Sequence, residues 1–467
     1  MPPIRPEPEA TKQPEIELRA TKSFPAFRLP VARKGKLEKF LSHFADVRDG
    51  EGLGVVLLTT NLFVLLFAYY LLKTVREALI LTEGGAYVKA YSSAGQAALL
   101  MLVIPLYGFV ATKIDRLRLI AGLLAFFTLN LAIFYVFGAA GAREGVVFYI
   151  WVGIFNVFVI SQFWAFATDI YTEQQGERLF PMIGVGSSLG AWLGAQSAES
   201  LVHLLHATPY QLQLLAAGLL ILSVGLLVAA NRATVRGKTI PSAVETAKSP
   251  LGPGDGFSLV FKKRYLVLIA VLTVLLNVVN SGGEFLLGKL VAEQAHLLHG
   301  GDPAAQKQFI GGFYGSFFAG VNLLGFLVQT FVVSRLFRFA GVRGALFVLP
   351  AIALMSYSVL AFVPILGLVR VLKTLENATD YSLQNTVKQA LFLPTSREEK
   401  YKAKAAIDTF FMRLGDVVEA GIVRLGAEFQ IATSGFAWLN VGFTLVWLGV
   451  VARLVREHRK LAASPGT

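Results

Sequence analysis

The chain has 467 residues, of which 55% are hydrophobic and only 16% are charged, and its mean hydropathy is +0.60. This composition excludes an ordinary soluble protein and indicates an integral membrane protein. Cysteine is absent and the six histidines are scattered, which excludes disulfides, thiolate metal sites and cysteine nucleophiles.

The first part of the chain, residues 1–52, is polar and lacks the short apolar core of a cleavable signal, so we expect a cytoplasmic tail. Behind it, apolar windows of about 20 residues, the length that a helix needs to cross a bilayer, recur along nearly the whole sequence. They predict an all-α integral membrane protein with about twelve transmembrane helices. The predicted spans are 53–80, 90–112, 119–137, 146–168, 180–200, 210–230, 265–288, 308–333, 342–362, 364–388, 405–427 and 434–452.

A long polar segment, residues 231–264, separates the sixth span from the seventh and is rich in Pro, Gly and Ser. It predicts a cytoplasmic linker between two six-helix bundles, 53–230 and 265–452, with a C-terminal tail at 453–467. Lys and Arg are concentrated in both tails and in alternate connections, which predicts cytoplasmic termini rather than nucleic-acid binding. Two halves with the same orientation favour a major-facilitator-like fold with a site between them.

Charged residues close the first span, in the stretch YYLLKTVREALIL. Near a helix end, a lysine can extend its ammonium group to the membrane interface, so Lys73 alone would have an ordinary structural explanation. However, Lys73 and Arg76 share one helical face with Tyr69. We therefore expect this face to meet a polar cavity, and Glu77 to hold the cations, bind protons or form a gate.

The tenth span, GLVRVLKTLENATDYSLQNTVKQALFLP, gives a stronger signal. Polar residues recur there at intervals of three or four and predict a continuous stripe along one helical face. A charge at mid-bilayer costs at least about 2.5–3.5 kcal/mol, so the stripe must face water, a substrate or other charges. The stripe comprises Arg370, Lys373, Asn377, Tyr381, Gln384 and Lys388, and Glu376 and Asp380 border it.

The eleventh span repeats this pattern, and Glu284 closes the seventh span much as Glu77 closes the first. The polar residues of the eleventh span are Asp408, Arg413, Asp416, Glu419 and Arg424. Arginine and lysine together suit phosphate or carboxylate groups, so we expect an anionic substrate. The predicted substrate-binding residues are Lys73, Arg76, Arg370, Lys373, Asn377, Tyr381 and Lys388. The predicted gating or coupling residues are Glu77, Glu284, Glu376, Asp380, Asp408, Arg413 and Asp416.

Several stretches resemble the ATP/ADP antiporter family, the nucleotide transporters of plastids and intracellular bacteria, which are distant relatives of the major facilitators. They are AYYLLKTVREALIL, SQFWAFATDIYTEQQGERLFPMIGVGSSLGAWLG, YSLQNTVKQALFLP and KYKAKAAIDTFFMRLGD. The resemblance implies two six-helix bundles that rock around a central site. It also adds Asn156 and Asn280 to the predicted substrate-binding residues, at positions where the nucleotide exchangers of the family carry acids.

These observations predict a secondary transporter of a nucleotide or similar phosphorylated anion, working by alternating access and exchange, and not an enzyme. The alternatives are a carrier or flippase for another anionic metabolite or lipid, and a membrane sensor that has kept the transporter fold. We expect no cofactor and no metal, the lipid bilayer and a small anion as partners, no nucleic acid, and a monomer. The expected location is a bacterial inner membrane, with both termini in the cytoplasm.

Overall fold

The apolar spans predicted from the sequence correspond to helices or to runs of consecutive helical segments. The computed structural model describes residues 35–42, 46–111, 116–171, 173–237, 256–396 and 399–463, and the regular elements in these ranges are all helices. The N-terminal half contains α1 (Lys36–Leu41), α2 (Gly52–Glu83), α3 (Gly85–Ala111), α4 (Arg116–Ala139), α5 (Gly145–Ile170), α6 (Glu173–Leu204) and α7 (Pro209–Gly237).

The C-terminal half contains longer helices interrupted by π-helical turns, which are labelled η. Its elements are α8 (Gly256–Lys262), α9 (Arg264–His299), α10 (Pro303–Leu327), η1 (Val328–Val332), α11 (Val333–Ala345), α12 (Val348–Phe362), α13 (Leu366–Thr379), η2 (Asp380–Gln384), α14 (Asn385–Ala390), η3 (Glu399–Ala403), α15 (Lys404–Ala406), η4 (Ile407–Phe411), α16 (Met412–Glu428) and α17 (Thr433–Ala463).

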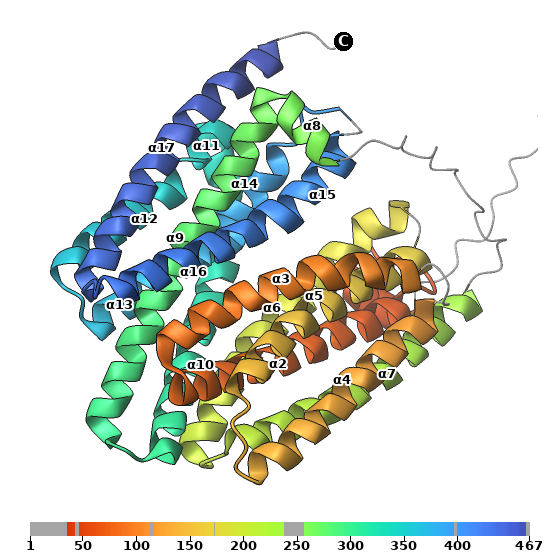
Figure 1. The fold of residues 1–467 in the computed structure, drawn as a ribbon. Coiled ribbons are helices and arrows are strands. Elements are labelled where there is room, and N and C mark those ends of the chain that lie inside the picture. Colours follow the sequence, from red (N-terminus) through yellow and green to blue (C-terminus); the bar gives the residue numbers. More distant parts are fainter. Residues whose placement is uncertain are drawn as a thin grey trace, which may run out of the picture.

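The helices form two bundles (Figure 1). In the first, α2 packs against α5, α6 and α7, and α4 packs against α7; in the second, α9 packs against α16 and α17, and α12 packs against α13 and α17. This arrangement confirms the predicted all-α membrane fold of two helical bundles. Residues 1–34, 43–45 and 238–255, which include most of the expected tail and much of the expected linker, lie outside the described residues.

Seven helices among the described residues are long and apolar enough to cross a membrane by length and composition alone. The helical stretches at α6, at α13 with α14, and at α16 are not among them. Of these, α13, α14 and α16 carry several polar residues of the predicted site, so their average hydropathy understates their capacity to span a bilayer inside a bundle.

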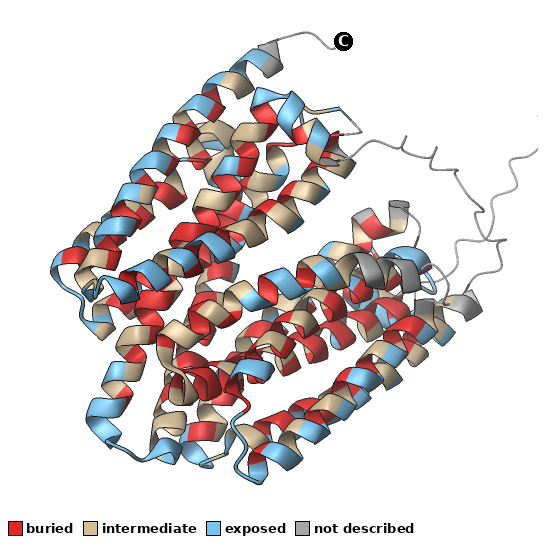
Figure 2. Ribbon diagram, in the orientation of Figure 1, coloured by how far each residue is buried: buried red, intermediate tan, exposed pale blue. Residues whose placement is uncertain are grey.

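The outer surface of the bundles is apolar. Figure 2 shows exposed residues along the outer sides of the helices and buried residues along the sides that meet neighbouring helices. On α4, Phe126, Leu129, Val136 and Phe137 are each more than half exposed. Large apolar side chains in such numbers are costly in water and stable in hydrocarbon, so this surface fits a bilayer.

Three glycines on α6 allow it to pack closely against α2. A Cβ added at Gly194 would lie 2.6 Å from the carbonyl oxygen of Phe67, and at Gly186 and Gly190 it would lie closer still to backbone oxygens of α2. Small residues four positions apart let two helices approach in this way within a membrane. Their repeat in the sequence is therefore explained by packing.

Each half has an ion pair that joins the start of its first long helix to a segment near its fifth. In the N-terminal half, Arg178 Nη2 lies 2.9 Å from Glu51 Oε1, just before α2. In the C-terminal half, Lys263, just before α9, pairs with Glu399 in η3. The two pairs have opposite polarity, with the acid on the first helix in one half and on the later segment in the other.

The Glu51 pair gives a pH-dependent prediction. Burial disfavours its ionised form, but hydrogen bonds from Arg178, the Arg48 backbone and Gln175 hold the pKa of Glu51 below its ordinary value. A carboxylate with a lowered pKa stabilises the fold above its ordinary pKa, and this contribution is lost as pH falls through the folded value. We expect wild type to lose more thermal stability than Glu51→Gln when the pH falls from about 7 to about 3. Glu428→Gln, at an exposed position, should lose as much thermal stability as wild type over the same pH range.

The two halves contact each other mainly near the ends of α6, α9 and α10. There α10 packs against α6 and α2, α16 packs against α3, and α3 also meets α9. From this region the bundles diverge toward the end that carries α8 and the C-terminus (Figure 1). The polar residues predicted to form a site lie close to the contact region.

Candidate functional site

A cavity of about 140 Å³ lies between the two halves, and we call it the central cavity. Of the residues predicted from the sequence, Lys73, Arg76, Asn280, Glu284 and Tyr381 all line it. They come from α2 and from α9 and η2, so residues more than 200 positions apart share one space. The rest of the lining consists of Ala86, Lys89, Ala90, Ser93, Tyr149, Ser281, Phe285, Phe318 and Glu419.

Lys73 is the cation with the most unusual surroundings. It is 8% exposed, and its ammonium lies 4.0 Å from the centre of the Phe318 ring, with Tyr70 and Tyr381 also within 6 Å. Within the described part of the chain, no carboxylate forms an ion pair with it. Cation–π contacts offset only part of the cost of burying a charge. The remaining cost of burying this ammonium would be offset by an anion close to it.

On the neighbouring turn, Glu77 balances two cations. Its carboxylate pairs with Arg76, and its Oε2 lies 2.7 Å from Lys89 Nζ on α3. The guanidinium of Arg76 also lies over the ring of Tyr149, 4.5 Å from its centre. Glu77 is 1% exposed, so it orients these cations from behind the cavity.

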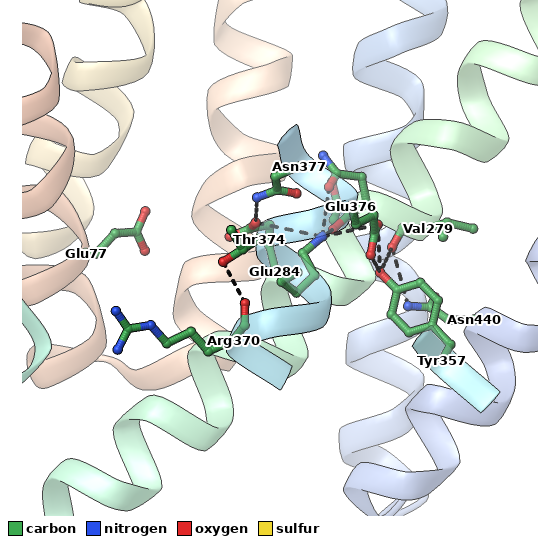
Figure 3. A network of polar contacts seen from close by, with 12 residues as sticks. Glu77, Val279, Glu284, Tyr357, Arg370, Thr374, Glu376, Asn377 and Asn440 are labelled. Atoms are coloured by element: carbon green, nitrogen blue, oxygen red, sulfur yellow. Dashed lines mark hydrogen bonds and ion pairs between the residues drawn. The ribbon is translucent and has the colours of Figure 1, made fainter. Parts of the chain in front are cut away.

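A second polar network lies in the C-terminal half (Figure 3). Lys373 on α13 donates to Asn280 Oδ1 at 2.9 Å and to Glu376 Oε1 at 3.2 Å. The hydroxyl of Tyr357 on α12 donates to Glu376 at 3.0 Å. Since Lys373 and Glu376 are both buried, each supplies the charge that makes burial of the other tolerable.

Glu284 connects this network to the N-terminal half. Its Oε1 accepts from Asn377 Nδ2 at 2.9 Å and lies 3.9 Å from Lys373 Nζ, while its Oε2 lies 3.8 Å from Lys89 Nζ on α3. Ion pairs therefore run from Arg76 through Glu77 and Lys89 to Glu284. The sequence predicted that charges of both halves gather at their interface, and the described structure has this arrangement.

Other predicted residues lie outside the lining of the central cavity. Arg370 donates to Ser316 Oγ at 2.9 Å, and Arg413 pairs with Asp416, three residues further along the same helix. Asp416 also accepts hydrogen bonds from Asn277 and Ser281. Asp380 in η2 and Asn156 on α5 are half-buried and do not line the central cavity.

The polar stripe of the tenth span is not continuous. Lys388 Nζ lies 4.0 Å from Asp408, which also pairs with Lys404, and this cluster is separate from the central cavity. The π-helical turn η2 lies between Lys373 and Lys388. A π-turn adds a residue to the helix and rotates everything after it, so a regular period overestimates the shared face.

Lys89 and Glu419 line the central cavity but were not among the predicted site residues. Lys89 was assigned to a loop because the second apolar span was expected to begin at residue 90, whereas α3 begins at Gly85. Glu419 is 3% exposed, and its Oε1 has no hydrogen-bond partner within the described residues. Its spacing of three from Asp416 was a signal that could have identified it.

Comparisons with known proteins bear on this site. Residues 327–458 match the model of the TLC ATP/ADP transporter family. The ADP,ATP carrier protein 1 of Chlamydia trachomatis is 22% identical over 497 aligned positions, which cover 90% of this chain and 91% of that protein. The chain is thus similar in sequence to the ATP/ADP transporters. The ADP,ATP carrier protein 4 of Rickettsia bellii is 20% identical, and the match spans 65% of each protein, just under two thirds of the Rickettsia protein.

Solved structures show a fold similar to that of this chain. A peptide transporter, POT, solved in complex with sulfate, superposes with a TM-score of 0.60 at 13% identity, covering 86% of this chain and 95% of that one. At such low identity the likeness concerns the fold alone. The expected resemblance to the ATP/ADP transporters and the expected all-α fold are thereby confirmed, and the chain is a multi-pass integral membrane protein.

Proposed function

We propose that the protein is a secondary transporter that exchanges a nucleotide, or a similar phosphorylated anion, across the membrane by alternating access. The observation that carries this proposal is Lys73, a buried ammonium at the interface of two halves with no ion pair among the described residues. An anion bound there would supply the missing charge, and its binding energy would favour a conformation in which both halves enclose it.

The space available fits part of such a substrate. The central cavity, at about 140 Å³, is below the roughly 300 Å³ at which drug-sized pockets begin, so it suits a phosphate group rather than a whole nucleotide. A second cavity of about 240 Å³ lies beside it, and Tyr381 lines both. Its polar lining residues are uncharged and include Ser187, Asn322 and Gln329, which suits a sugar or a base.

The proposal includes an orientation. The sequence places Lys and Arg in both tails and in alternate connections, so both termini would face the cytoplasm of a bacterial cell. The halves contact each other near the connection between α9 and α10, on the opposite side of the membrane by this assignment. The described conformation would then be closed toward the outside, with the carrier a monomer in the inner membrane.

Uptake of labelled ATP into proteoliposomes loaded with ADP tests the function. We expect Lys73→Gln to reduce uptake by about tenfold to a hundredfold, since a hydrogen bond to a charged group contributes about 1.5–3 kcal/mol. Lys289→Gln is the matched control, because Lys289 is a half-buried lysine of α9 outside the cavity. Absence of nucleotide exchange by wild type, with uptake of another anion or lipid from a panel, would refute the nucleotide assignment.

A further inference from the structure

We propose that Glu284 acts as an anion of the protein itself, which pairs with Lys89 and Lys373 in the empty carrier. It joins the two halves until a substrate anion displaces it. We call this contact between the halves the lock. The inference rests on the proposed function for the identity of the substrate, and on the geometry of the carboxylates of Glu77, Glu284 and Glu376 for the lock itself. It assigns to Glu284 the role of an internal competitor, in addition to that of a residue lining the site.

The three carboxylates differ in how tightly they are held. Glu77 lies 2.7 Å from Lys89, and Glu376 lies 3.2 Å from Lys373. Glu284 lies 3.8 Å from Lys89 and 3.9 Å from Lys373, so it is the looser partner of both cations. Since Coulomb attraction falls with distance, an incoming anion at hydrogen-bond distance would replace Glu284 more readily than the other two.

The exposed fractions of the three side chains also indicate that Glu284 is the carboxylate most easily displaced. The side chain of Glu284 is 25% exposed, compared with 1% for Glu77 and 5% for Glu376. Glu284 lines the central cavity, whereas the other two carboxylates lie behind it. An entering anion therefore meets Glu284 first, and water can solvate that carboxylate once it is displaced.

The pair with Lys89 crosses between the halves, because Lys89 is on α3 and Glu284 is on α9. While it is intact, separation of the halves at this point would leave Glu284 with one fewer cation. Once a substrate anion binds the cations, this cost disappears, and the halves are free to rock. An empty carrier held in this way moves slowly, which is what strict exchange requires.

Distances between spin labels test the lock without any substrate. The natural chain has no cysteine, so Leu204→Cys on α6 and Leu297→Cys on α9 label only two exposed positions, one in each half. In the ligand-free protein, adding Glu284→Gln should shift the distance distribution to longer values. Adding Glu293→Gln, at an exposed position on the same helix, should leave it unchanged. An unchanged distribution with Glu284→Gln overturns the proposal.

Nucleotide affinity provides the second readout, by thermal shift with ATP. We expect Glu284→Gln to bind ATP about threefold to tenfold more tightly, because the competitor has lost its charge while the acceptor for Asn377 remains. Lys89→Gln should also lengthen the label distance but weaken ATP binding. A role limited to structure predicts no gain in affinity, so, where wild type binds ATP, equal or weaker ATP binding by Glu284→Gln overturns the proposal.

The two hypotheses can fail separately. If ligand-free Glu284→Gln opens the label distance while wild type shows no exchange of ATP for ADP, the lock stands and the nucleotide assignment fails. If wild type exchanges nucleotides and Glu284→Gln leaves both distance and affinity unchanged, the proposed function stands and the lock is rejected.

Discussion

Replacing Lys373 by methionine should lower the free energy of unfolding by about 3–5 kcal/mol and weaken ATP binding. Lys373 is 1% exposed and holds Asn280, Glu284 and Glu376 through its ammonium. Without it, Glu376 is a buried carboxylate whose nearest polar partner is the Tyr357 hydroxyl. The thermal unfolding midpoint in detergent, together with ATP titration, measures both effects.

A second substitution separates the two consequences. The double variant Lys373→Met with Glu376→Gln removes both members of the buried pair, so it should recover much of the lost stability. It should not recover ATP binding, because Asn280, which lines the central cavity, still lacks the lysine that positions it. A Lys373→Met protein as stable as wild type would contradict the buried pair described here.

Replacing Gly190 by valine should destabilise the N-terminal bundle by about 1–3 kcal/mol or more. A side chain there would clash with the carbonyl oxygen and Cα of Phe63 on α2. Backbone atoms cannot relieve such a clash by changing rotamer, as a flexible side chain can. The two helices must separate, with loss of contacts along their whole seam. Thermal unfolding and the yield of monodisperse protein measure this loss.

The matched control is Gly184→Val on the same helix. An added Cβ at Gly184 has no neighbour within 4 Å, so this variant bears the same change in helix propensity without the clash. Its unfolding midpoint should stay close to that of wild type. If both variants lowered the unfolding midpoint equally, helix propensity rather than close packing would account for the loss of stability.

The sequence predicted most of the helices because hydrocarbon imposes a simple rule. A backbone in lipid must form its own hydrogen bonds, so apolar stretches of sufficient length become helices whatever their neighbours are. The ends were less certain, since an apolar window says little about the polar turns that extend it. Thus α7 continues to Gly237 and α17 to Ala463, beyond the predicted spans.

The candidate site was partly predictable for a related reason. Lys73, Arg76 and Glu284 are too costly to face lipid, so their position at the interface of the halves followed from energy alone. Lys388 and Arg370 obeyed the same rule, yet they lie with other partners outside the central cavity. The free-energy cost of a charge in hydrocarbon means that such a side chain needs polar surroundings. Any nearby carboxylate or hydroxyl can provide them.

The sequence by itself thus determined the membrane class, the helices and the set of charges that must avoid lipid, because these depend on local composition and on the bilayer. Only the tertiary structure decided which charges meet. The pairing of Lys89 with Glu77 and Glu284 depends on how α3 lies against α2 and α9, and the turn η2 decides which face Lys388 occupies. Such contacts depend on the rotation and spacing of whole helices, which no short stretch of sequence contains.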